Sequence, residues 1–92
     1  MSRYGTANST YAFMKGGLIF MVIVLTENNI CESMKMMRNE MRWTQFTTAR
    51  NLGIPRSSYS EYELGRRHIS MKLFLRLAEL CDCQIILNDK LY

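Results

Sequence analysis

Apolar and polar positions along the chain predict a series of short helices. Apolar residues recur every three or four positions from Ile30 to Met41, which is the stripe of an amphipathic helix. We expect this helix to begin near Glu27, with Thr26 as its N-cap, because a threonine directly before a helix can accept a backbone N–H.

Two shorter helices with a tight turn between them are predicted within Thr44–Gly65. The first runs from Gln45 to about Leu52 behind the N-cap Thr44, and the second runs from about Arg56 to Leu64. Gly53 lies between them, where a glycine adopts positive φ at the lowest cost. The side chains expected to face inward are Phe46, Ala49 and Leu52 in the first helix, and Tyr59, Tyr62 and Glu63 in the second.

A fourth helix and a short strand follow. Ser70 is expected to cap a helix from Met71 to about Cys81, which carries a broad apolar face. Gln84–Leu87 is a short apolar run that predicts a strand.

The apolar run Leu18–Leu25 admits three interpretations. It could be the hydrophobic part of a signal peptide, but no small-x-small cleavage pattern follows it. It could lie on a membrane surface, but it lacks an amphipathic period, and it is far shorter than the roughly 20 residues of a membrane-spanning helix. Its length and its Ile, Val and Phe content favour a buried β-strand. We predict that it pairs with Gln84–Leu87 in one small sheet, within a chain or across a dimer.

The first 17 residues are small, polar and aperiodic, and they end in Gly-Gly. This composition predicts a disordered or weakly ordered segment over 1–17. Residues 18–92 are then expected to form one domain, which suits the length of the chain.

Composition restricts the chemistry. The net charge of +4 permits binding to a polyanion without requiring it. Three cysteines, an odd number, do not suggest a disulfide framework, and we interpret them as reduced thiols. One His and no second Cys pair argue against a metal site, and no nucleophile–base arrangement or glycine-rich phosphate loop is present. We therefore expect no cofactor, no metal and no enzymatic activity.

Two helices joined by a short turn containing Gly are typical of a helix-turn-helix. Here the sequence resembles the Cro/Xre-type helix-turn-helix regulators of phages and bacteria over about Ile30 to Leu87. The matching residues are Thr44-Gln45, Ala49, Gly53-Ile54, Arg56-Ser57-Ser58-Tyr59-Ser60, Tyr62-Glu63, Gly65-Arg66, Ser70, Leu73, Leu77 and Ala78. The resemblance implies a mainly α fold, a lambda-repressor-like bundle of about four helices, to which we add short pairing β-strands at both ends.

The resemblance also implies a set of DNA-contacting residues. Positions that face base edges are matched by Arg56, Ser57 and Glu61, with Ser60 nearby, and backbone-phosphate positions by Thr44, Gln45, Arg66 and Arg67. Arg38 and Glu63 match a structural ion pair between the first and third helices. On a helix that lacks this pattern of matching residues, an Arg or Ser on the outer face is usually only solvated and contacts no ligand.

Two functions follow as hypotheses. The first is a cytoplasmic, sequence-specific binder of double-stranded DNA that acts as a homodimeric transcriptional regulator, a repressor, with helix 56–64 in the major groove. The second is an antitoxin-type module that covers a partner toxin through the strand Leu18–Leu25 and represses its own promoter. A small membrane-anchored protein is a weaker third hypothesis.

Overall fold

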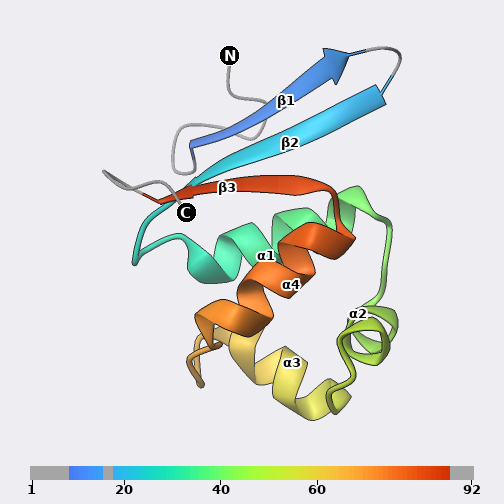
Figure 1. Cartoon of the computed structure of the whole chain (residues 1–92). Coiled ribbons are helices and arrows are strands. Elements are labelled where there is room, and N and C mark those ends of the chain that lie inside the picture. Colours follow the sequence, from blue (N-terminus) through green and yellow to red (C-terminus); the bar gives the residue numbers. More distant parts are fainter. Residues whose placement is uncertain (1–8, 16–17, 88–92) are drawn as a thin grey trace.

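The computed structural model describes residues 9–15 and 18–87 and is mainly helical (Figure 1). Its elements are, in chain order, β1 (Ser9–Lys15), β2 (Leu18–Leu25), α1 (Ile30–Glu40), α2 (Gln45–Leu52), α3 (Arg56–Leu64), α4 (Met71–Leu80) and β3 (Cys83–Leu87). The bounds of α2 and α3 are those predicted from the sequence, and α4 ends one residue earlier than expected. The predicted fold class, a helical bundle with paired strands at its two ends, is confirmed.

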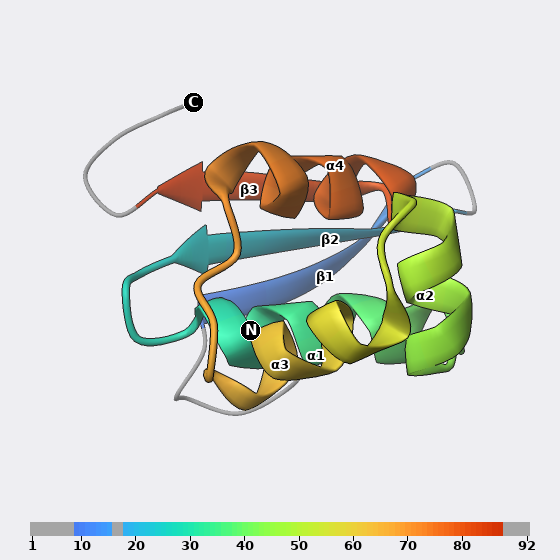
Figure 2. The same ribbon diagram turned by 90° about the horizontal axis from the view of Figure 1, so that it is seen from below.

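The three strands form one sheet in the order β1-β2-β3. β1 pairs antiparallel with β2, and β2 pairs parallel with β3, from Met21 beside Cys83 to Leu25 beside Leu87. The predicted pairing of the two apolar runs is therefore confirmed, and it occurs within one chain. The sheet lies against α1 and α4, while α2 and α3 lie on the side away from it (Figures 1 and 2).

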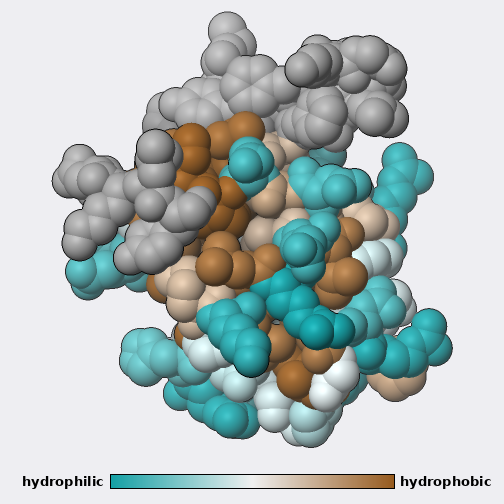
Figure 3. Space-filling model, in the orientation of Figure 1, coloured by the Kyte–Doolittle hydropathy of each residue, from teal (hydrophilic) through white to brown (hydrophobic). Residues whose placement is uncertain are grey.

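The core lies between the sheet and the helices. In β2, Met21, Ile23 and Leu25 are buried and the residues between them are half-buried, as expected of a strand with one face on the core. The largest fully buried apolar side chains from the helices are Met34, Met37, Tyr59, Phe74 and Leu77. In Figure 3, hydrophobic residues gather around the sheet and α4, and the α2–α3 end is mainly hydrophilic or of intermediate hydropathy.

The start of the first helix differs from the prediction. α1 begins at Ile30, and its N-cap position is Asn29 instead of Thr26. Asn29 is buried, and its side chain binds the incoming chain: Oδ1 accepts from the Thr26 N–H at 2.8 Å, and Nδ2 donates to the Val24 carbonyl at 3.0 Å. Residues 26–29 therefore form a turn between β2 and α1, which local capping preference alone did not indicate.

β1 was not predicted either, since Ser9–Lys15 lies in the segment 1–17 that we expected to be disordered or weakly ordered. A strand as apolar as β2 needs a neighbour along each edge, and β1 supplies the second one. That pairing is a tertiary contact that a polar, aperiodic segment does not signal. The rest of the segment, 1–8 and 16–17, lies outside the described residues, and the division of the chain at residue 17 stays a prediction.

The inner face of α2 also differs from the prediction at one position. Thr48, Ala49 and Leu52 are buried, whereas Phe46 is 58% exposed. Phe46 lies about 110° around the helix from the centre of the buried arc, at 3.6 residues per turn. Thr48 fits inside because its hydroxyl donates to the Thr44 carbonyl at 2.9 Å.

Candidate nucleic-acid interface

The turn between α2 and α3 is closed by backbone hydrogen bonds. Gly53 has φ +73°, its N–H donates to the Arg50 carbonyl at 3.1 Å, and the Ile54 N–H donates to the Ala49 carbonyl at 3.0 Å. This pair of bonds is a Schellman motif, which ends α2 and reverses the chain. Pro55 then precedes α3 in an extended conformation, where its missing N–H leaves no partner unsatisfied.

The angle between the helices is held by the carboxylate of Glu63. Its Oε2 accepts from Arg38 Nε at 2.7 Å and from the Tyr59 hydroxyl, and its Oε1 accepts from Arg38 Nη2 at 3.2 Å and from Gln45 Nε2 at 3.1 Å. The Glu63 side chain is only 2% exposed. One buried carboxylate therefore joins α1, α2 and α3, and the Arg38–Glu63 ion pair implied by the resemblance is present.

The charge state of Glu63 is set by two opposing effects. Burial acts to raise the pKa of the carboxyl, but the hydrogen bonds from Arg38, Tyr59 and Gln45 outweigh it and hold the pKa below its ordinary value. The hydrogen bond between Arg38 and Glu63 also raises the pKa of Arg38, although burial acts to lower it. Both groups are therefore charged at neutral pH.

The two candidate phosphate-binding residues at the start of α2 have structural roles as well. Thr44 is the N-cap, and its hydroxyl oxygen accepts from the Thr47 N–H at 3.1 Å. Gln45 is half-buried with its amide on Glu63, so one amide hydrogen is occupied and a second is left for a further acceptor. The network thus fixes the direction of the Gln45 side chain before any ligand arrives.

The four candidate base-reading residues share one side of α3, which spans about 140° at 3.6 residues per turn. Arg56 and Ser57 are exposed in the first helical turn, while Ser60 and Glu61 are half-buried. The buried Tyr59 and Glu63 lie outside this arc, about 60° and 20° beyond Arg56 around the helix axis. This confirms the predicted inward side, except that Tyr62 is only partly buried.

The basic connector after α3 contains two arginines in different surroundings. Arg66 is exposed after Gly65, which ends the helix at φ +78°. Arg67 folds back over α3, with Nη1 3.2 Å from Ser58 Oγ and 3.5 Å from Glu61 Oε1, and its guanidinium lies 5.3 Å from the centre of the Tyr62 ring. Arg67 therefore contacts one of the candidate base-reading residues.

The structure thus contains two helices, α2 and α3, held at a fixed angle and joined by a short turn. The second helix has an exposed polar side. A family model described as Helix-turn-helix matches residues 34–87, which is more than half of the chain. The chain belongs to the helix-turn-helix family. The match agrees with the Cro/Xre-type resemblance, and the comparisons with curated proteins and with solved structures gave no match.

Membership of the helix-turn-helix family makes this a DNA-binding domain of the transcription-regulator type. Domains of this family are regulatory and not typically enzymatic. In the described part of the chain, no group of three His, Cys, Asp or Glu residues could hold a metal ion, and all three cysteines are free. Within the same part, no helix is long and apolar enough to cross a membrane.

The sequence analysis assigned no contact to two side chains that lie beside the candidate site. Ser58 contacts Arg67, and Arg50 lies over the ring of Phe46, with its guanidinium carbon 6.0 Å from the ring centre. The four-residue spacing of Phe46 and Arg50 on one helix could have indicated this second contact.

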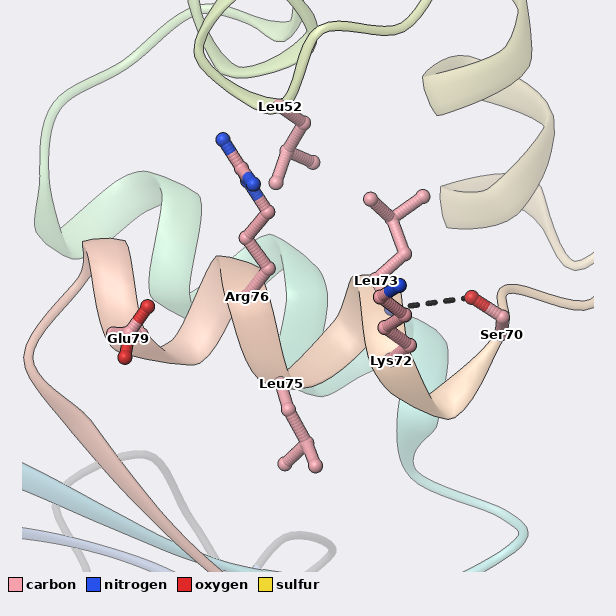
Figure 4. Close-up of a pocket in the computed structure, with 7 residues that line it drawn as sticks. All are labelled: Leu52, Ser70, Lys72, Leu73, Leu75, Arg76 and Glu79. Atoms are coloured by element: carbon pink, nitrogen blue, oxygen red, sulfur yellow. Dashed lines mark hydrogen bonds between the residues drawn. The ribbon is translucent and has the colours of Figure 1, made fainter.

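A hollow lies apart from α3. It has a volume of about 530 Å³ and is lined by Leu52, Ser70, Lys72, Leu73, Leu75, Arg76 and Glu79. Figure 4 shows Arg76 and Leu73 extending from α4 toward Leu52 at the end of α2, with Leu75 on the opposite side of the helix. None of the candidate DNA-contacting residues lines it, so it provides positions for control substitutions.

Proposed function

We propose that the protein is a sequence-specific binder of double-stranded DNA that represses transcription, with α3 inserted in the major groove. The observation that carries this proposal is that buried side chains anchor α3 while its first turn is exposed. Its inner side is anchored by Tyr59 and Glu63, and its first turn carries the exposed Arg56 and Ser57. A helix that buried side chains hold in place can present its exposed side chains to base edges without rearranging.

The proposed base contacts follow from the chemistry of the side chains. Arg56 suits the O6 and N7 acceptors of guanine, because its guanidinium can donate two parallel hydrogen bonds. Glu61 suits the N4 donor of cytosine, and Ser57 and Ser60 can donate or accept. Glu61 lies 3.5 Å from Arg67, so a cytosine contact would be made next to a cation that limits the repulsion from the DNA.

Phosphate contacts are proposed from residues at the start of α2 and from residues that follow α3. Thr44 and Gln45 lie at the N-terminus of α2, where backbone N–H groups and the helix dipole favour an anion. The exposed Arg66 and the neighbouring Arg67 would bind phosphates beyond the other end of α3. These contacts would position the helix without selecting the sequence.

We propose that two copies bind together, on half-sites about one helical turn apart. Four base-reading residues specify a short half-site, and a twofold-symmetric pair doubles its length. In the described sheet β3 lies at an edge, and Cys83–Leu87 contains no charged residue or proline of the kind that protects natural edge strands. Self-pairing of this strand would give the symmetric dimer.

Binding-site selection from random duplex DNA tests the proposal. We expect a selected sequence, and for Arg56→Ala a loss of about 1 to 3 kcal/mol with relaxed specificity at one position. Arg66→Ala should weaken binding to all sequences and lower the salt dependence by about one phosphate contact. Arg76→Ala is the matched control on α4. If selection recovers no sequence and neither variant changes affinity, the proposal fails.

An antitoxin-type module that also represses its own promoter is the second candidate. The sequence predicted that Leu18–Leu25 would bind the partner by joining its sheet. This mode of binding is ruled out because β2 is the central strand and is paired on both edges. In the described sheet the outer edge of β3 is unpaired, and it offers the same mode of binding by strand addition. Purification from the native host decides, since the absence of a stoichiometric partner would count against this candidate.

A further inference from the structure

Phe46 is an exposed aromatic residue in a region of the surface where polar side chains would be expected. It is 58% exposed on the second position of α2, directly after Gln45. Arg50, one turn further along, places its guanidinium 6.0 Å from the ring centre. Such a stack holds a cation at a defined place while leaving its N–H donors free.

This pair borders a hollow of about 260 Å³ between α2 and the start of α3. Its lining residues are Phe46, Ala49, Arg50, Ile54, Pro55 and Arg56. The only charged residues among them are the two arginines, and no salt bridge joins either one to an acidic residue in the described ranges. The hollow therefore combines an apolar floor with two cations at its rim.

Those two properties match a segment of DNA backbone. A phosphodiester offers an anion to a guanidinium, and the adjacent deoxyribose offers an apolar face to an aromatic ring or a proline. An acidic protein surface could satisfy the arginines as well. The DNA backbone is favoured because Arg56, which lines the hollow, belongs to the proposed base-reading set. Phe46, which also lines it, directly follows Gln45 of the proposed phosphate-binding set, so the hollow continues that interface.

We propose that the hollow formed by Phe46, Arg50 and Pro55 is an additional DNA-backbone site. Arg50 binds one phosphate, Phe46 packs against the neighbouring sugar, and Arg56 passes from the rim of the hollow into the groove. The inference rests on the proposed function and extends it. It adds a contact outside Thr44, Gln45, Arg66 and Arg67, and it makes the position of Arg56 depend on that contact.

Fluorescence anisotropy with the selected duplex at three salt concentrations provides the test. For Arg50→Ala we expect affinity to fall about tenfold and the slope of log K against log salt to decrease by about 0.9, the value for one phosphate. Arg50→Lys should keep the slope, because the charge remains. Phe46→Ala should lower affinity about threefold to tenfold at every salt concentration with the slope unchanged, because it removes only apolar contact and orientation.

Two matched variants serve as controls. Arg76→Ala removes an exposed arginine from α4, and Leu80→Ala removes an apolar side chain that is 37% exposed at the end of α4. Both should bind the duplex like the wild-type protein. Thermal unfolding of every variant checks that the fold is kept, which is expected since Phe46 and Arg50 are exposed.

The outcomes separate this inference from the proposed function. A wild-type protein that binds no duplex overturns both. Wild-type binding together with unchanged affinity and slope for Arg50→Ala overturns the backbone site alone. A loss of affinity in Arg50→Ala with an unchanged salt slope also overturns it, because a phosphate contact must release counterions.

Discussion

The guanidinium of Arg38 binds both carboxylate oxygens of Glu63, through Nε at 2.7 Å and Nη2 at 3.2 Å. Its remaining nitrogen, Nη1, donates to the Trp43 carbonyl at 3.1 Å. Arg38 thus fixes α3 and the connector before α2 at the same time. The planar fork of an arginine is suited to this double role, which a lysine could not fill.

We expect Glu63→Gln to lower the free energy of unfolding by about 3 kcal/mol, because it leaves the partly buried Arg38 without its counterion. Denaturant unfolding followed by circular dichroism measures the change. Glu61→Gln is the matched control on the same helix, since the partly exposed Glu61–Arg67 pair at 3.5 Å should contribute less than about 1 kcal/mol. Equal effects of the two substitutions would contradict the assigned role of Glu63.

Stability should also depend on pH through Glu63. Because the pKa of Glu63 in the folded protein lies below its ordinary value of 4.5, the unfolded state binds a proton first as the pH falls. The stabilisation is therefore complete above about pH 5.5 and is lost as the pH falls through 4.5 toward the folded-state pKa. Unfolding free energies measured from pH 7 to pH 3 should fall more steeply for the wild-type protein than for Glu63→Gln. Parallel curves would rule out this contribution.

Gly53→Ala should destabilise the protein by about 1 to 2 kcal/mol through backbone strain alone. The residue has φ +73°, and a Cβ built on it would meet no atom within 4 Å, so no steric clash contributes. Gly53→Asn should cost less, because asparagine tolerates the left-handed region better. Thermal unfolding of both variants checks the order, and an alanine variant as stable as the wild type would contradict it.

Asn29→Ala should cost about 2 kcal/mol, since it leaves the Thr26 N–H and the Val24 carbonyl without their partner in a partly buried turn. Asn29→Asp keeps the acceptor for the Thr26 N–H and loses the donor to Val24. Its stability, measured by denaturant unfolding, should fall between the other two. An alanine variant as stable as the wild type would show that water replaces both bonds.

The elements predicted well were those with local signals. Ser70 caps α4 as expected, with its hydroxyl oxygen accepting the Leu73 N–H at 3.1 Å, and Gly53 and Gly65 end their helices at positive φ. Local preference was misleading where a tertiary contact decided the outcome. Thr26 is a good cap by type, but the helix begins after Asn29, whose side chain makes no capping hydrogen bond and binds Thr26 and Val24 instead.

The candidate site was predicted in its position on α3 but not in its surroundings. Periodicity identified the outer side of the helix, because a short amphipathic helix has one buried face. It could not show that Arg67 folds back onto Ser58 or that Phe46 is exposed, since those depend on where neighbouring elements lie. The roles of Arg56, Ser57, Ser60 and Glu61 in DNA binding stay predictions.

The parallel pairing of β2 with β3 has a consequence for the order of folding. The two strands lie on either side of the whole helical part of the chain, so their ladder can form only after a long loop closes, whereas α2 and α3 meet through a short turn. Contacts between distant segments form slowly because closure entropy must be overcome first. We therefore expect the helix-turn-helix to appear early in refolding and the sheet to join late, which would leave the apolar β2 exposed in the meantime and make nascent chains prone to aggregate.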